Sequence, residues 1–147
     1  MENKQEQSYE NHRRLYPLQH FVLMPLGLVT FLAAIGFAIA DAVSGELDWK
    51  TVVLFSLVLQ SVITGILTRR NSLVVQDRVI RAEEGLRHLA LTGKPLSGKL
   101  TIRQIIALRF ASDEEFPQLA AQAAESGLSP ADIKKSVKQW RADHHRV

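Results

Sequence analysis

Two long runs without a charged residue constrain this chain more than any other feature of its sequence. Residues 21–40, FVLMPLGLVTFLAAIGFAIA, and residues 51–68, TVVLFSLVLQSVITGILT, contain no Asp, Glu, Lys or Arg. A helix of about twenty residues spans the hydrocarbon core of a bilayer. A polar segment, residues 41–50, separates the two runs. We therefore predict a transmembrane hairpin over residues 17–70, with spans at 17–40 and 51–68 and an outer loop at 41–50.

The first run also has some features of a secretory signal. Arg13 and Arg14 precede it, and Ala38-Ile39-Ala40 resembles a cleavage site. The apolar stretch is, however, longer than the ~7–15 residues typical of a signal peptide, and a second span follows at once. We predict a retained helix. Cleavage remains the alternative, and it would leave a mature chain that begins at Asp41.

The orientation of the hairpin follows from its flanking charges. Arg13 and Arg14 lie before the first span, and four arginines follow the second, whereas the connecting loop has a net charge of −2. Lys and Arg concentrate on the cytoplasmic side of membrane helices, so both termini are expected in the cytoplasm. The four arginines also serve as candidate contacts for anionic lipid head groups. They are Arg69, Arg70, Arg78 and Arg81.

Small and polar residues recur along one face of each predicted span. Such residues let membrane helices approach closely and form hydrogen bonds across the pair. The predicted packing residues are Ser56, Gln60 and Thr64 on the second span and Thr30, Ala34 and Ala38 on the first. Gln60 would join the hairpin or an oligomer. The alternative is a polar transport path, but ion pathways in membranes usually need an ionisable group, and the spans contain none.

The chain after the second span has helical periodicity. Residues 71–91 are predicted to form a juxtamembrane helix that extends the second span, and the Gly- and Pro-rich residues 92–99 a linker. About fifty residues are marginal for independent stability, so the domain that follows is expected to pack on this helix or on a partner. The apolar stripe of the helix comprises Leu73, Val79, Ile80, Leu86, Leu89 and Ala90.

Residues 100–147 contain three helix-start patterns and are predicted to form a three-helix cytoplasmic domain. Capping-box patterns begin at Thr101 and Ser112, and Ser129-Pro130 begins the third helix. The second helix is expected to end near Gly127, and the third to extend through Trp140 and Arg141. With residues 1–16 as a cytoplasmic arm, the predicted fold class is all-α: a two-helix transmembrane hairpin with a small helical cytoplasmic domain.

The sequence shows no constellation typical of catalysis or of cofactor binding. The chain has no cysteine, and its histidines lack the spacing of a metal site. The segment GKPLSGK has Leu100 where a P-loop needs Ser or Thr, and no strand precedes it. Three short helices with a basic third resemble a helix-turn-helix motif that binds DNA. The negative charge of the acidic residues in 100–147, however, nearly cancels the positive charge of the basic ones. We therefore predict no catalytic, metal or cofactor residue and disfavour nucleic acid as a partner.

Three segments resemble a family of small bacterial two-span membrane proteins of unknown function. They are the arm QSYENHRRLYPLQH at 7–20, the paired spans, and LTIRQIIALRFASDEEFPQLAAQAAESGLSPADIKKSVKQWRADHHRV at 100–147. The similarity extends over nearly the whole chain. It implies a location in the bacterial inner membrane, and it implies no reaction, cofactor or catalytic residue.

These observations favour a non-enzymatic interaction module anchored in the membrane, or an accessory subunit of a larger complex. The expected partners are the lipid bilayer and either another protein or further copies of this chain. The candidate contact residues are Phe110, Asp113, Glu114, Glu115, Trp140, Arg141 and His144. An oligomeric channel or transporter component and a membrane-tethered nucleic-acid binder are the alternatives.

Overall fold

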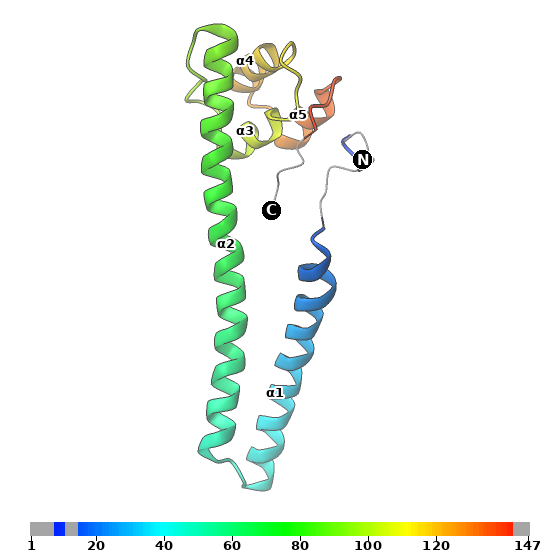
Figure 1. The fold of residues 1–147 in the computed structure, drawn as a ribbon, viewed down its shortest axis with the longest axis vertical. Coiled ribbons are helices and arrows are strands. Elements are labelled where there is room, and N and C mark those ends of the chain that lie inside the picture. Colours follow the sequence, from blue (N-terminus) through cyan, green and yellow to red (C-terminus); the bar gives the residue numbers. More distant parts are fainter. Residues whose placement is uncertain (1–7, 11–14, 143–147) are drawn as a thin grey trace. The chain divides into compact units, whose positions relative to one another are not determined.

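The computed structural model describes residues 8–10 and 15–142, and their secondary structure is helical (Figure 1). The described residues fall into two compact units, residues 15–72 and residues 73–142 with 8–10, which are treated separately below. A single isolated bridge, Ala111 with Trp140, is the β-type pairing within the described part of the chain. The helices are η1 (Leu18–Leu23), α1 (Met24–Ser44), α2 (Trp49–Thr92), α3 (Ile102–Leu108), α4 (Phe116–Ser126) and α5 (Pro130–Ser136).

The first helix begins directly after Pro17 and changes its hydrogen bonding at Pro25. Residues Leu18–Leu23 form a π-helix, in which the amide of Met24 bonds to the carbonyl of Gln19. Proline has no N–H to donate to the carbonyl four residues back, so the regular α-helical ladder is interrupted there. The helix continues across this point as α1, as expected for a proline that local rearrangement accommodates.

The connection between α1 and α2 is shorter than the predicted loop at 41–50. Helix α1 continues to Ser44 and ends at Gly45, whose φ of 77° favours glycine, and α2 begins at Trp49. The carboxylate of Asp48 accepts the amides of Lys50 at 2.9 Å and Thr51 at 3.0 Å, which caps α2. Asp41 lies in the last turns of α1 and accepts a hydrogen bond from the Thr51 hydroxyl. The loop is therefore shorter than predicted, because Asp41 belongs to α1 and Asp48 caps α2.

Helix α2 contains both the predicted second span and the predicted juxtamembrane helix. It has 44 residues without a break, from Trp49 to Thr92. At its C-terminus the Thr92 hydroxyl bonds to the carbonyl of His88 at 2.7 Å, and the amide of Gly93, with φ of 70°, bonds to Leu89. The helix therefore ends where the sequence TGKP predicts that it should.

The three short helices confirm some of the predicted boundaries and correct others. Thr101 forms a full capping box with Gln104, Ser129 caps α5, and α4 ends at Gly127 with φ of 62°. The Ser112 pattern instead forms a turn, and α4 begins only at Phe116. The prediction that the third helix extends through Trp140 is wrong, because α5 stops at Ser136 and residues 137–141 continue as a non-helical segment with a bend at 138–139, which we call the strap.

The core of the C-terminal unit lies between α3, α4 and α5, beside the C-terminal part of α2 (Figure 1). The largest fully buried side chains are apolar and come from all three short helices and the loop after α3. The capped ends fix the three helices around this small core, and the strap closes it on one side. These side chains are Phe110, Phe116, Ile105, Leu108 and Ile133.

Candidate interaction surface

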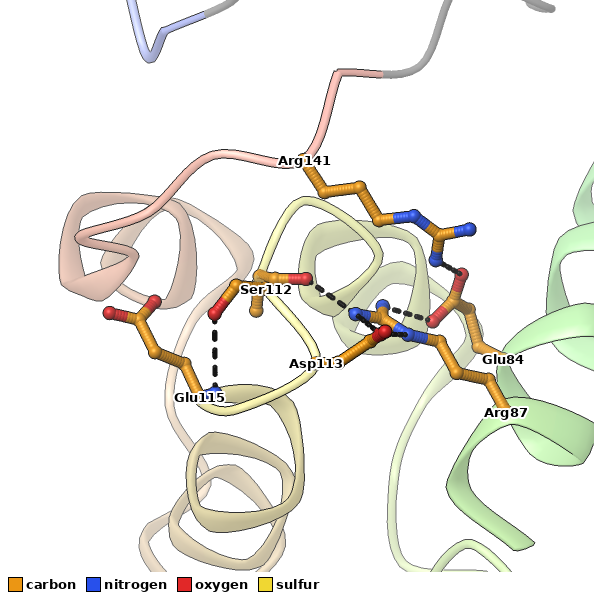
Figure 2. Close-up of polar contacts among 7 residues, drawn as sticks. Glu84, Arg87, Ser112, Asp113, Glu115 and Arg141 are labelled. Atoms are coloured by element: carbon orange, nitrogen blue, oxygen red, sulfur yellow. Dashed lines mark hydrogen bonds and ion pairs between the residues drawn. The ribbon is translucent and has the colours of Figure 1, made fainter. Parts of the chain in front are cut away.

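Arg87 is the polar centre of the contact between α2 and the short helices. Its guanidinium donates to the Ala111 carbonyl at 2.7 Å and to the Asp113 carboxylate at 2.7 Å, and it pairs with Glu84 at 3.0 Å. The charged group also lies 4.5 Å from the centroid of the Phe116 ring. Figure 2 shows the side chain reaching from α2 to the loop before α4. One arginine thus joins three parts of the unit, and its side chain is only 10% exposed.

The strap is held by backbone bonds rather than by a helix. The amide of Arg141 donates to the Phe110 carbonyl at 2.8 Å, and the amide of Ser112 donates to the Gln139 carbonyl at 3.1 Å. A carboxylate oxygen of Glu115 accepts the amide of Lys138 at 3.1 Å. These pairings satisfy backbone amides that leave the helical pattern after Ser136.

Three of the seven predicted contact residues, Phe110, Asp113 and Glu115, make contacts within the unit. Phe110 is 1% exposed and its ring stacks on Trp140 at a centroid distance of 4.9 Å, so this ring is not available to a partner. Asp113 is bound to Arg87, and Glu115 is bound to the strap.

The other predicted contacts fall into three groups. Glu114 and Arg141 are exposed. The Arg141 guanidinium lies 3.9 Å from the Glu84 carboxylate, and Figure 2 shows the two side chains pointing toward each other. Trp140 is half-buried. His144 lies outside the described residues. Sequence reasoning found polar and aromatic residues that matter to the unit, but it could not distinguish internal contacts from external ones.

The predicted packing residues of the second span differ from the positions of α2 that the structure shields. Ser56, Gln60 and Thr64 are exposed, and the Ser56 hydroxyl bonds within its own helix to Val52 at 2.7 Å. Thr30 is likewise exposed and bonds to Leu26. The shielded positions of this part of α2 are Thr51, Phe55, Val58 and Val62, and those of α1 include the predicted Ala34 and Ala38.

Most of the partly shielded positions of the two hairpin helices, α1 and α2, carry apolar or small side chains. Asp41 and Thr51 provide the polar bond between them at the turn. Gln60, the residue predicted to join the helices, remains on an open face.

The predicted lipid-contact arginines lie on α2. Arg70, Arg78 and Arg81 are exposed and Arg69 is half-buried. This placement leaves at least three of the four guanidinium groups accessible to solvent or to head groups.

The apolar stripe predicted for the juxtamembrane helix is mostly exposed. Ile80 is buried at 7% exposure, but Leu86 is 69% exposed and Leu89 is 46% exposed. The face of α2 that contacts the domain carries Glu84 and Arg87 instead. Helix α2 and the short helices thus meet through Arg87, while Leu86 and Leu89 of the stripe stay exposed.

An open apolar surface remains on α2, which we call the seam. Its members are exposed and follow one another at helical spacing, so they lie on one face of the helix. Monomeric soluble domains rarely leave a contiguous apolar surface of this kind uncovered. The seam consists of Val75, Val79, Ala82, Leu86 and Leu89.

A groove of about 440 Å³ lies beside the seam within the same unit. Its walls are Gly85, Leu86 and Leu89 of α2, Pro95 and Leu96 of the loop, and Ile105 of α3. The lining is mostly apolar, and Gly85 leaves open space where a larger side chain would stand. The seam and the groove share Leu86 and Leu89 and form one apolar surface on the C-terminal unit.

Comparison with known proteins gives a family and no activity. No curated protein and no solved structure matches the chain. The model of a family of unknown function, DUF6526, matches residues 1–147. Because that match extends over the whole sequence, from the arm through both apolar helices to the strap, the chain belongs to the family of unknown function DUF6526.

Proposed function

We propose that this chain is a membrane-anchored interaction module of the bacterial inner membrane, and that it docks partners on the seam and groove of its C-terminal unit. The single observation that carries the proposal is the contrast between the two surfaces of α2. The face of α2 toward the short helices holds the buried Glu84–Arg87 ion pair, whereas another face of the same helix leaves Leu86 and Leu89 exposed. Apolar surface of this kind is stabilised when another molecule covers it.

The membrane part of the proposal is supported by exposure as well as by length. The helical stretches Leu18–Ser44 and Trp49–Thr92 contain windows with mean hydropathy of 2.4 and 2.0. Only 0% and 6% of these windows are buried. A core helix of a soluble protein would be mostly covered by its own domain, so a lipid environment accounts better for these side chains.

The orientation of the hairpin is supported by the charges at its ends. The turn carries Asp41 and Asp48, and the exposed arginines follow the second apolar stretch. We therefore place the turn outside and the C-terminal unit in the cytoplasm.

We favour binding over catalysis because the carboxylates of the C-terminal unit named below already have partners within the unit. The carboxylates of Glu84, Asp113 and Glu115 are each engaged by a cation or by backbone amides within the unit. The groove beside the seam is lined mainly by apolar groups, which favours packing over acid–base chemistry.

Membrane insertion is tested by alkaline carbonate extraction and by reporters fused at Val147. The proposal expects the chain to stay in the membrane pellet and the reporter to be cytoplasmic. A chain that is washed into the supernatant, or a periplasmic reporter, contradicts it.

Docking is tested by cross-linking the tagged chain in intact membranes and identifying bound proteins by mass spectrometry. We expect Leu86→Glu to abolish a cross-linked species that Leu91→Glu preserves. Leu91 is the matched control, since it is also an exposed leucine of α2, at 42%, but lies on a different face. Recovery of the monomer alone under several cross-linkers, or equal loss in both variants, contradicts docking through the seam.

A further inference from the structure

The seam has the spacing of a coiled coil. Its members follow one another in steps of four, three, four and three residues, which places Val79 and Leu86 at a positions and Val75, Ala82 and Leu89 at d positions. Helices with this repeat pack side by side, each apolar residue entering a gap between four residues of the facing helix. A β-branched residue such as Val79 at an a position favours two strands. The seam is thus shaped for one further helix.

Charged residues at the edges of the seam identify that helix. In this register Arg78 occupies a g position and Glu83 the following e position, and both are exposed. Among the described residues neither has an ion-pair partner. In a parallel pair, a g residue lies opposite the e residue five positions further along the partner helix. A second copy of α2 therefore places Glu83 opposite Arg78 on both edges.

An antiparallel arrangement does not use these charges. It brings g opposite g and e opposite e, so Arg78 would lose Glu83 as its counterpart. Two copies inserted in one membrane with the same orientation send their α2 helices in the same direction. The shared orientation in one membrane rests on the proposed function, and it selects the parallel arrangement, which the charges of Arg78 and Glu83 also favour.

The sequence repeats the same steps upstream of the seam. Ser61, Gly65, Thr68 and Ser72 continue the pattern of four and three residues, and within their own unit all four are exposed. Small residues are what helix pairs use within lipid, where close backbone approach replaces the hydrophobic effect. The change from small to larger apolar residues suits a helix that passes from lipid into water.

We infer that the chain forms a parallel homodimer through α2, in which Val75, Val79, Ala82, Leu86 and Leu89 of the two copies interlock and Arg78 of each copy pairs with Glu83 of the other. The seam has few heptads, so the isolated pair is weak. Confinement of both copies to one membrane raises their effective concentration and compensates for the short length.

Cysteine cross-linking tests the contact directly, because the natural chain contains no cysteine. We expect Leu86→Cys and Val79→Cys to give disulfide-linked dimers on oxidation in intact membranes. Leu91→Cys, on another face of α2, is expected to remain monomeric. Equal dimer yields for Leu86→Cys and Leu91→Cys would show random collision and overturn the inference.

Charge reversal tests the register. In the Leu86→Cys background, Arg78→Glu or Glu83→Arg alone sets like charges against each other, and we expect about tenfold weaker dimerisation. The double reversal, Arg78→Glu with Glu83→Arg, is expected to restore the yield. Both single changes are at exposed positions, so a failure to fold does not mimic the result. Failure of the double variant to recover overturns the pairing.

The same samples separate this inference from the proposed function. The chain could resist carbonate extraction and capture another protein through Leu86, yet give no seam-specific disulfide. That result would overturn the homodimer and leave the proposed function standing. A chain that carbonate releases refutes the membrane anchor. A seam-specific disulfide in that released chain would support a soluble dimer and remove the membrane argument for its parallel orientation.

Discussion

Replacing Arg87 by Met should uncouple the short helices from α2 while preserving most of the side chain's volume. The change removes the hydrogen bonds to Ala111 and Asp113 and the cation over the Phe116 ring. It also leaves the Glu84 carboxylate, with its side chain 7% exposed, without its closest cation. The C-terminal unit would then contain a buried charge that is only partly compensated.

The magnitude follows mainly from Glu84. Breaking a buried ion pair by removing one partner costs about 3–5 kcal/mol. Arg141 lies 3.9 Å from the other carboxylate oxygen and offsets part of this, whereas Asp113, at 61% exposure, contributes little. Since these terms share one group and do not add, we expect a net loss of about 3 kcal/mol. For a domain of this size that corresponds to a fall in Tm of roughly 12–24 °C.

Hydrogen exchange of the full-length protein in detergent gives the appropriate assay, because it reports the C-terminal unit separately from the apolar helices. Amides of α3 and α4 should lose protection in Arg87→Met, and Arg81→Met serves as the control. Arg81 is on the same helix and exposed. The double variant Glu84→Gln with Arg87→Met should recover part of the loss, since it removes the stranded charge. Equal exchange in Arg87→Met and Arg81→Met would refute the reasoning.

Three further changes test local features of the same unit by the same exchange measurement. Thr101→Ala removes the capping box of α3 and should cost about 1 kcal/mol, with Thr101→Ser retaining most of the stability. Gly127→Ala forces a side chain into the left-handed region at φ of 62° and should cost about 1 kcal/mol, whereas Gly98→Ala, in open space without positive φ, should be nearly neutral. Glu115→Ala should raise exchange at Lys138 selectively, because its amide loses its acceptor, and unchanged exchange there would contradict that role.

Local signals in the sequence were sufficient for much of the fold. The all-helical class, the two apolar helices, the caps at Thr101 and Ser129 and the stop at Gly127 all depend on a few neighbouring residues. Such interactions are visible in a sequence because both partners lie within one helical turn.

Long-range contacts decided what the sequence could not show. The strap forms because Ala111 pairs with Trp140, almost thirty residues away, and this overrides the helical pattern of its own residues. The domain docks on Arg87 because its partners, Ala111 and Asp113, are distant in the chain. Apolar periodicity therefore indicated the helix, but it could not show that Arg87 makes the contact with the domain.

The strap has a consequence for shortened forms of the protein. Its residues come after all the described helices in chain order, yet they supply the bonds to Phe110, Ser112 and Glu115 and the Trp140 ring that lies against Phe110. A chain that ends shortly after Ser136 would therefore contain all the described helices but would lack the indole that covers the Phe110 ring.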